Sequence, residues 1–482
     1  MTTAVPYQQP AHRIPRRPTV PYVELTNDVL GGISGFQRLG YGILLFYLFL
    51  IYSRIFDVKF SFLHLPGISY RVILVMMLLG RAFVPGLKHP IGKAMYFLTF
   101  WMLVATPFSM WKGGSVAVLQ DAWIPTFVIF LATSGLLVTF EQCRKSLFTV
   151  GLGLCVLTFI AIVYGNTESS GRLFLPNGKF SNPNEMAQAL CMGLPLVWLM
   201  FQESTNGLKK VMAGGIIFLM LLMISKCGSR GALITIAVLF MLAFLRASIM
   251  GKTKLLLAVV GICTILLALM PGKLIRRYKT LDESEEQQTF SAGDDNYDER
   301  METSAVTSAQ HRRDLLKRSI KYTLQHPLFG VGPGMFPVAE DTDMRNQGFR
   351  KGTWQGTHNS YTQVSSEEGI PALIAYIVVI VLSFRRTSQL MRKTKDDPRL
   401  RSITNCATAL NYCMIIYAVS VFFDYIAYTS MLSVFAGLCM ALDVTASAEI
   451  NRLTAIPREP DPIPFTQFRA NWRRTAGAPQ EA

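Results

Sequence analysis

The stretch "GTHNSYTQVSSEEGIPALIAYIVVIVL" occupies residues 356–382 and joins a polar, titratable segment to an apolar run. The apolar run has the composition of a membrane span, which needs about 20 mostly apolar residues to cross roughly 30 Å of hydrocarbon. His358 stands just before this run, and Glu367 and Glu368 fall in its first turns. A carboxylate at membrane depth is costly unless it is paired or faces a cavity. We therefore expect a membrane helix with a polar site at its outer end.

The composition of the whole chain is that of an integral membrane protein. Of its 482 residues, 51% are hydrophobic and 16% are charged, with a mean hydropathy of +0.33. A soluble domain usually carries about 25% charged residues. The net charge of +16 lies in short runs between apolar segments, as basic loops next to membrane spans require. No motif of a nucleic-acid-binding fold is present, so we expect membrane lipids, and no nucleic acid, as partners.

The apolar segments predict an all-α polytopic membrane protein with about twelve transmembrane helices. The expected spans are 38–56, 70–86, 92–110, 123–140, 146–164, 185–202, 210–226, 230–247, 254–271, 362–384, 403–423 and 425–446. The chain then divides into a disordered basic N-terminus, nine spans, a large loop, three further spans and a disordered tail, over residues 1–37, 38–271, 272–361, 362–446 and 447–482.

The distribution of Lys and Arg predicts the orientation, because basic loops stay in the cytoplasm. Every strongly basic short loop falls on the side of the N-terminus, which places both termini inside and two loops, 165–184 and 272–361, outside. The acidic first part of the long loop predicts a mobile segment. Its second part has helical spacing at Leu315, Leu316, Ile320 and Leu324 and predicts an amphipathic helix that stops at His326-Pro327.

Neither the cysteines nor the other ligand-type residues predict a metal or a disulfide. The cysteines have no CxxC pairing and no His/Cys ligand spacing. Nearly all lie inside apolar runs, so we expect buried small apolar side chains. We also find no cluster of carboxylates or histidines with ligand spacing, and we expect no cofactor and no metal. The residues are Cys143, Cys155, Cys191, Cys227, Cys263, Cys406, Cys413 and Cys439.

The opening stretch supplies the first candidate for chemistry. A histidine with an ordinary pKa near 6.5 can act as a general base near neutral pH, and His358 is placed to do so. Asn359 and Tyr361 could orient its ring or a sugar hydroxyl, and Glu368 adds a carboxylate. The competing interpretation is that His358-Asn359-Ser360 caps a helix and that the glutamates are interface residues.

The second candidate is "SKCGSRGALITI", residues 225–236, where Arg230 stands at the start of a span. A guanidinium at the outer membrane edge is suited to grip a phosphate through two hydrogen bonds. The alternative is an arginine that extends to the headgroup level. The outer position of Arg230 runs against the positive-inside trend, which favours a function.

Two further stretches add candidate ligands on the same outer side. In "GRLFLPNGKFSNPNEMAQAL", residues 171–190, Arg172 and Lys179 could contact an anion, and Asn184 could cap a helix or bind sugar; turn residues alone would look the same. In "HPLFGVGPGMF", residues 326–336, no strand precedes the glycines and no Lys-Ser pair follows, so we reject nucleotide binding and expect a tight turn. Arg312 and Arg313 lie one helix upstream, and both are candidates for phosphate contact.

Together these stretches resemble the O-antigen ligase and O-antigen polymerase superfamily. The resemblance rests on Ser229-Arg230-Gly231-Ala232, on the turn Pro327–Gly334, on His358-Asn359-Ser360-Tyr361 with Glu368-Gly369, and on the Asn-rich "SNPNEMA" at 181–187. These elements cover roughly residues 170–380, in the order in which the family has them. The first 37 residues and the acidic insertion near 282–302 have no family counterpart that we identify.

The resemblance implies a multi-pass enzyme of the bacterial inner membrane with its active site at the periplasmic face and a large periplasmic loop before the tenth span. The reaction implied is an inverting, metal-independent glycosyl transfer from an undecaprenyl pyrophosphate carrier to a hydroxyl acceptor. His358 would take the proton of the acceptor hydroxyl, and Arg230 would stabilise the leaving pyrophosphate. Arg312 or Arg313 would be a second phosphate contact, and Arg172 is a weaker candidate.

Two alternative functions remain at this point. A polymerase of O-antigen or exopolysaccharide repeats uses the same chemistry as a ligase and differs in its acceptor, which is another lipid-linked repeat rather than the lipid A-core of lipopolysaccharide. A transporter or flippase of a lipid-linked glycan is the alternative of a different class. Transporters tend to show two similar halves, and we see no such internal symmetry.

Overall fold

The structure is a computed structural model that describes residues 35–58, 61–168, 170–176, 181–269, 272, 297–348, 350 and 352–455. Residues 1–34 of the predicted disordered N-terminus and most of the acidic insertion lie outside the described residues, whereas residues 35–37 already belong to helix α2 (Gly35–Ser53). The tail from residue 456 onward also lies outside the described residues. The predicted start of that tail at residue 447 differs from the structure, because helix α20 continues to Ala455.

The described residues are almost entirely helical. One two-stranded antiparallel sheet joins β1 (Asn166–Thr167) to β2 (Leu173–Phe174), with Asn166 opposite Phe174. The α-helices, in chain order, are α2 (Gly35–Ser53), α3 (Ile55–Val58), α4 (Leu65–Leu79), α5 (Val84–Lys88), α6 (Pro90–Ala105), α7 (Lys112–Val118), α8 (Ile124–Gly135), α9 (Phe140–Tyr164), α10 (Pro183–Glu203), α11 (Gly207–Lys226), α12 (Arg230–Arg246), α13 (Ile249–Leu269), α15 (Tyr297–Gln325), α16 (Phe336–Asn346), α17 (Ser360–Glu368), α18 (Ile370–Thr394), α19 (Arg401–Ser420) and α20 (Ser430–Ala455).

The architecture is an all-α polytopic membrane protein. Within the described residues, nine helical segments are long and apolar enough to cross a membrane: Gly35–Ser53, Pro90–Phe108, Lys112–Gly135, Phe140–Tyr164, Gly207–Lys226, Ile249–Leu269, Ile370–Thr394, Pro398–Ser420 and Ser430–Thr454. The other three predicted spans also coincide with helices. However, α4 has 15 residues and α12 has 17, and α10 begins with the polar residues Asn184, Glu185 and Gln188. By length and hydropathy, nine helical segments of the described residues qualify as membrane spans, rather than the predicted twelve.

The predicted span 362–384 is divided in the structure. A short helix, α17, ends at Glu368, and α18 begins at Ile370. Gly369 between them has φ +86°, a conformation that a helix cannot contain, and Pro371 then occupies the first turn of α18. Glu367 and Glu368 consequently lie before the apolar span rather than inside it.

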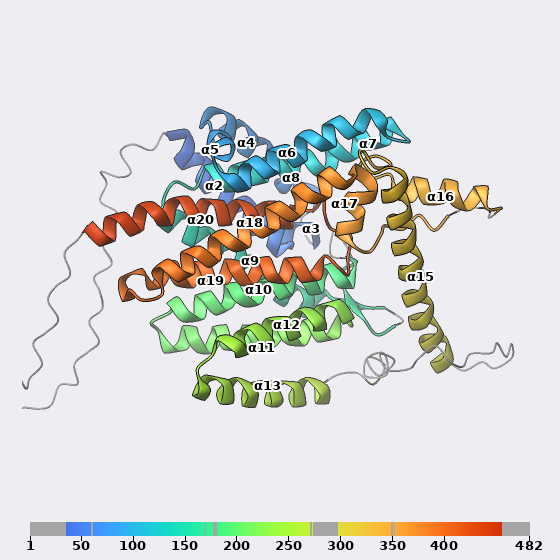
Figure 1. The fold of residues 1–482 in the computed structure, drawn as a ribbon. Helices are drawn as coiled ribbons and strands as arrows, with labels where there is room; N and C mark the ends of the chain where they lie inside the picture. Colours follow the sequence, from blue (N-terminus) through green and yellow to red (C-terminus); the bar gives the residue numbers. More distant parts are fainter. Residues whose placement is uncertain are drawn as a thin grey trace, which may run out of the picture.

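The long helices lie side by side, and α15 runs across one end of them at a large angle, close to α16 and α17 (Figure 1). Because α12 and α18 both begin at this end, Arg230 and Ile370 lie there, and the basic ends of the two helices lie at the other. The loop that holds β1 and β2 reaches the same end, since Arg172 Nε donates to the Cys227 carbonyl at 2.9 Å. We call this the site end of the bundle.

Helix α15 ends at Gln325, directly before the His326-Pro327 stop that the sequence predicts. Its buried face differs in part from the predicted one. Leu315 is 1% exposed, but Ile320 and Leu324 are exposed, and Tyr322 is buried in their place. The contact face thus follows positions 315 and 322, seven residues apart, which is the spacing of a helix packed on a neighbour.

The glycine-rich turn after α15 packs against the end of α17. The Val331 amide donates to the Ser366 carbonyl at 2.8 Å, and the Gly332 amide donates to the Glu367 carbonyl at 2.9 Å. Gly330 has φ +64°, and a Cβ there would lie 2.3 Å from the Glu367 carbonyl carbon. The turn therefore needs glycine both for its conformation and for the close approach of two backbones.

The core of the bundle is apolar, as the sequence predicts. Trp123, Phe130, Phe435 and Tyr417 are fully or almost fully buried. All eight cysteines are free, and seven are buried; Cys263, on the peripheral helix α13, is exposed.

We predict that Gly330→Ala lowers the thermal stability of the protein more than Gly348→Ala does. Both glycines have positive φ, but nothing lies within 4 Å of a Cβ at Gly348. Gly348→Ala, the control, should lower the free energy of unfolding by about 1 kcal/mol, because it introduces only conformational strain. Gly330→Ala adds a clash with the backbone and should lower it by roughly 2–4 kcal/mol. Unfolding midpoints of the two variants in one detergent, measured at one scan rate, check this; equal losses would contradict the docking of the turn.

Candidate functional site

The backbone around His358 is fixed by interactions with the loop between α19 and α20, residues 421–429. The Ser360 amide donates to the Val421 carbonyl at 2.8 Å, and the Ser360 hydroxyl donates to the Asp424 carbonyl at 2.8 Å. The same hydroxyl accepts from the Ile426 amide at 2.9 Å. The start of α17 and this loop therefore form one unit, and the residues at their edges are brought together.

Asn359 caps α17, in agreement with the competing interpretation of this residue. Its side-chain oxygen accepts from the amides of Tyr361 and Thr362 at 2.9 and 3.1 Å. Tyr361 donates its hydroxyl to the Ala418 carbonyl at 2.9 Å. Asn359 and Tyr361 thus both have hydrogen-bond partners within the fold, and these partners do not include the His358 ring.

His358 itself lies outside α17, in the left-handed conformation with φ +50°. Its half-buried ring meets the ring of Tyr425 edge-on, with centroids 5.3 Å apart. Among the described residues, its Nδ1 atom is buried and has no hydrogen-bond partner. A strained, non-glycine backbone conformation together with an unsatisfied buried nitrogen is typical of a functional rather than a structural histidine.

The electrostatic surroundings keep the His358 imidazole neutral. Burial, followed by the positive charges of Arg312 and His311, lowers its pKa from 6.5 to about 4. Arg312 comes from α15, and its own pKa is lowered by burial and by Arg230, although Asp424 opposes this. Arg312 therefore lies within electrostatic range of both predicted catalytic residues, His358 and Arg230.

Arg230 is the first residue of α12, behind the N-cap Ser229, whose side chain accepts from the Ala232 amide. It is half-buried, and Gly231 after it lets the Phe423 side chain approach closely, because a Cβ there would lie 2.7 Å from the Phe423 Cβ atom. The guanidinium is thus held at the site end of α12, next to the 421–429 loop.

A second arginine, Arg172, links two segments that are distant in the sequence. Its Nη2 donates to Asn184 Oδ1 at 2.7 Å, and its Nε donates to the Cys227 carbonyl at 2.9 Å. Asn184 is buried and is therefore an anchor for Arg172 rather than an exposed ligand. The arginine stands beside the loop that precedes Arg230.

Asp424 is a residue of the site that the sequence analysis missed. It is buried, and burial raises its pKa to about 6, while the Tyr425 amide and the charges of Arg312 and Arg172 lower it. One of its oxygens accepts from Gln188 Nε2 at 3.3 Å. An aspartate within a strongly apolar segment is costly without partners, and this signal alone could have found it.

The remaining predicted residues lie apart from this group. Arg313 is exposed, one position from Arg312 on α15, so its side chain leaves the helix in a different direction. Lys179 lies outside the described residues. Glu368 is buried and accepts from the Tyr428 hydroxyl.

Glu367 and Glu368 form a structural cluster with Tyr428. Glu367 also accepts from the amides of Gly334 and Phe336 at 3.1 and 3.2 Å, so its carboxylate holds the glycine-rich turn. Burial raises the pKa of Glu367 to about 7 and raises that of Glu368 as well. Two adjacent buried carboxyl groups around one hydroxyl are stable when at least one is protonated. We interpret this cluster as the support of the site, not as a substrate contact.

The site is therefore a cluster of cationic side chains at one end of a membrane bundle, with a neutral histidine beside it. Arg172, Arg230 and Arg312 come from three separate segments, with Asp424 as the buried acid near them. Arginines at the membrane edge are suited to phosphate, and a neutral imidazole is suited to accept a proton. In the part of the chain that the structure describes, no group of three or more His, Cys, Asp or Glu could hold a metal ion. The class defined is a polytopic membrane protein with a cluster of arginines beside a neutral histidine.

Comparison with known families agrees with this class. Residues 215–377 match the family model described as O-antigen ligase, a range that begins in α11 and ends in α18 and contains Arg230, Arg312 and His358. No curated protein matches the chain. The match supports the resemblance to the O-antigen ligase superfamily over this region of the chain.

We predict that His358→Gln changes how stability depends on pH. Between the unfolded pKa of 6.5 and the folded pKa of about 4, the unfolded chain binds a proton at His358 and the folded chain does not. His358 therefore destabilises the fold as the pH falls from 8 to 5, by roughly 1–2 kcal/mol. Unfolding midpoints of the wild type should fall relative to those of His358→Gln over this range, and parallel profiles would show that the ring is not held neutral.

Proposed function

We propose that the protein transfers a glycan from an undecaprenyl pyrophosphate carrier to a hydroxyl acceptor at the periplasmic face of the bacterial inner membrane, with both chain termini in the cytoplasm. The reaction inverts the anomeric centre and needs no metal. The observation that carries the proposal is the convergence of a neutral His358 with Arg172, Arg230 and Arg312 at one end of the bundle.

In the proposed reaction the acceptor oxygen attacks the anomeric carbon of the donor sugar. The bond between that carbon and the phosphate oxygen breaks, and its electron pair leaves with the pyrophosphate. The acceptor proton passes to His358; because Nδ1 is the buried nitrogen, we assign the transfer to Nε2. Attack from the face opposite the leaving group inverts the anomeric configuration, and no covalent glycosyl-enzyme intermediate forms.

The arginines supply the positive charge that the leaving group requires. Arg230 and Arg312 influence each other electrostatically, so two guanidinium groups face one region, and the negative charge of a pyrophosphate relieves their repulsion. Arg172 is fixed by Asn184 and the Cys227 carbonyl, and it is placed to position the donor rather than to move. These residues are preorganised before the substrate arrives.

The position of the site suits a substrate that is carried by a lipid. Its residues lie near the site ends of α12 and α18, where the apolar parts of these helices begin. A polyprenyl chain can therefore stay in the membrane while its pyrophosphate reaches the arginines. The identity of the acceptor separates a ligase from a polymerase, and both use this arrangement.

We predict that purified protein in liposomes transfers glycan from a defined lipid-linked oligosaccharide, and that His358→Ala loses at least about 100-fold of this activity. Mass analysis of the product identifies the acceptor: lipid A-core for a ligase, a lengthened lipid-linked repeat for a polymerase. Transfer that is intact in a folded His358→Ala protein would refute the role of the histidine. Movement of the substrate across the membrane without any transfer would indicate a transporter.

We predict that Arg312→Gln lowers transfer by about 100-fold, whereas Arg313→Gln stays within a few-fold of the wild type. The two variants lose the same charge from adjacent positions of α15, but only Arg312 is near His358 and Asp424. Arg230→Lys should recover part of the activity that Arg230→Gln loses, because an ammonium keeps the charge but not the planar fork. Rates measured at saturating donor check this order, and equal losses at positions 312 and 313 would contradict the assignment.

A further inference from the structure

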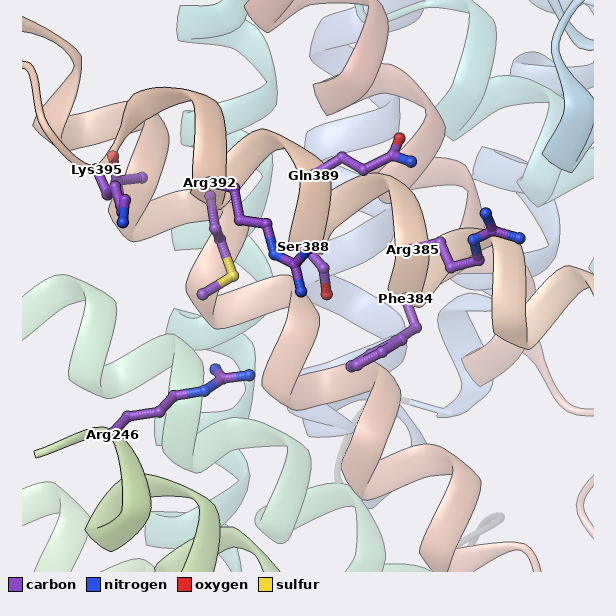
Figure 2. Close-up of a pocket in the computed structure, with 9 residues that line it drawn as sticks. Arg246, Phe384, Arg385, Ser388, Gln389, Arg392 and Lys395 are labelled. Carbon is purple, nitrogen blue, oxygen red and sulfur yellow. The ribbon is translucent and has the colours of Figure 1, made fainter.

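We propose that the end of the bundle opposite the site end binds the phosphate headgroup of an anionic phospholipid, in a cavity between α12, α18 and α19. The cavity has a volume of about 550 Å³. Figure 2 shows Arg246 extending from the end of α12 toward the face of α18 that carries Ser388 and Arg392. The lining residues are Arg246, Phe384, Arg385, Ser388, Gln389, Met391, Arg392, Lys395 and Thr404.

The cavity concentrates positive charge without a matching acid. Four of its nine lining residues are Arg or Lys, and none is Asp or Glu. Within the described residues, these four cations form no ion pair, whereas Arg386, which does not line the cavity, lies 3.6 Å from Asp443. Like charges gathered in one cavity repel each other, so a bound anion would stabilise this arrangement.

One face of α18 changes from apolar to cationic at the level of the cavity. Ile374, Val378 and Val381 are exposed, and the same face continues with Arg385, Ser388, Arg392 and Lys395, at alternating spacings of three and four residues. On α12, Leu245 is exposed directly before Arg246. A surface that is apolar up to one level and basic beyond it fits acyl chains below a phosphate headgroup.

Helix α19 supplies the floor of the cavity, because both α12 and α18 pack against it. Asn411 of α19 donates to the Ser388 hydroxyl at 2.8 Å and holds this polar group at the wall. The Arg246 guanidinium lies over the ring of Tyr412, 5.1 Å from its centroid. This cation–π contact orients Arg246 before any ligand binds.

The neighbouring apolar surface decides between a lipid and a soluble anion. Basic residues near membrane spans follow from the positive-inside rule alone, but that rule does not gather them around one cavity. A free phosphate would use only the cations, while a phospholipid also covers the exposed side chains of α18. The cavity is separate from the catalytic site, because the 17 residues of α12 span about 25 Å.

The test uses the full chain, purified in a neutral detergent, with added phosphatidylglycerol, phosphatidylcholine or glycerol 3-phosphate. The variant is Arg246→Gln with Arg392→Gln, and the matched control is Lys209→Gln with Lys254→Gln. The control removes two exposed charges from the same end of the bundle, outside the cavity. The readouts are the unfolding midpoint and the number of lipid molecules retained in native mass spectrometry.

We expect phosphatidylglycerol to raise the midpoint of the wild type and of the control more than phosphatidylcholine does. In the cavity variant the apparent affinity for phosphatidylglycerol should fall by tenfold or more. The proposal is overturned if both lipids act alike, if the control loses as much as the variant, or if glycerol 3-phosphate alone has the full effect. If the double variant does not fold, Arg392→Gln and Lys395→Gln, each at an exposed position, replace it with the same criteria.

Discussion

The hydrogen bonds between the start of α17 and the 421–429 loop are the constraint on which the candidate site depends. Ser360 donates and accepts across this junction, and Gln363 accepts from the Ala427 amide at 3.3 Å. These contacts satisfy non-helical backbone groups at the membrane boundary, where an unsatisfied group is costly. They also bring His358 and Asp424 into the same cluster of polar residues, although the two are distant in the sequence.

The second support of the site is the contact between the glycine-rich turn and α17. Because Glu367 accepts from two amides of the turn and its carboxyl group is hydrogen-bonded to Tyr428, one carboxyl group connects three segments: the turn after α15, the helix after His358 and the loop before α20. α15 is thereby fixed across the site end, which orients Arg312. Arg312 and His358 thus lie close together because buried polar contacts outside the proposed substrate site hold their segments in place.

Much of this arrangement could be predicted from the sequence, for physical reasons that differ by residue. Hydropathy marks the long apolar helices, because burial in lipid imposes a minimum length and composition. The end of α15 could be predicted because Pro327 cannot continue a helix. The break at Gly369 was missed, since a glycine within an apolar run does not by itself reveal a positive φ. Asp424 was missed because the last two predicted spans, 403–423 and 425–446, leave only one residue between them for a loop.

The roles of individual polar residues were harder to predict, because a side chain can serve the fold or the substrate with the same chemistry. Asn359 and Asn184 carry amides suited to sugars, yet each is engaged within the protein. Arg312 and Arg313 are equivalent in the sequence, and only the rotation of α15 distinguishes them. Contacts that depend on the phase of a helix or on a distant loop require the tertiary structure.

The low pKa of His358 has a consequence for the order of events in the proposed reaction. In the free protein burial, together with the positive charge of the nearby Arg312, lowers the pKa of His358 and makes the imidazole a weak base. A pyrophosphate bound by Arg312 and Arg230 brings negative charge to the same region, which offsets the arginine and raises the pKa of the histidine. The base thus gains strength when the donor is bound, and remains weak when it is absent. Such coupling favours deprotonation of the acceptor only in the complete complex, because the charge that binds the leaving group also controls the group that accepts the proton.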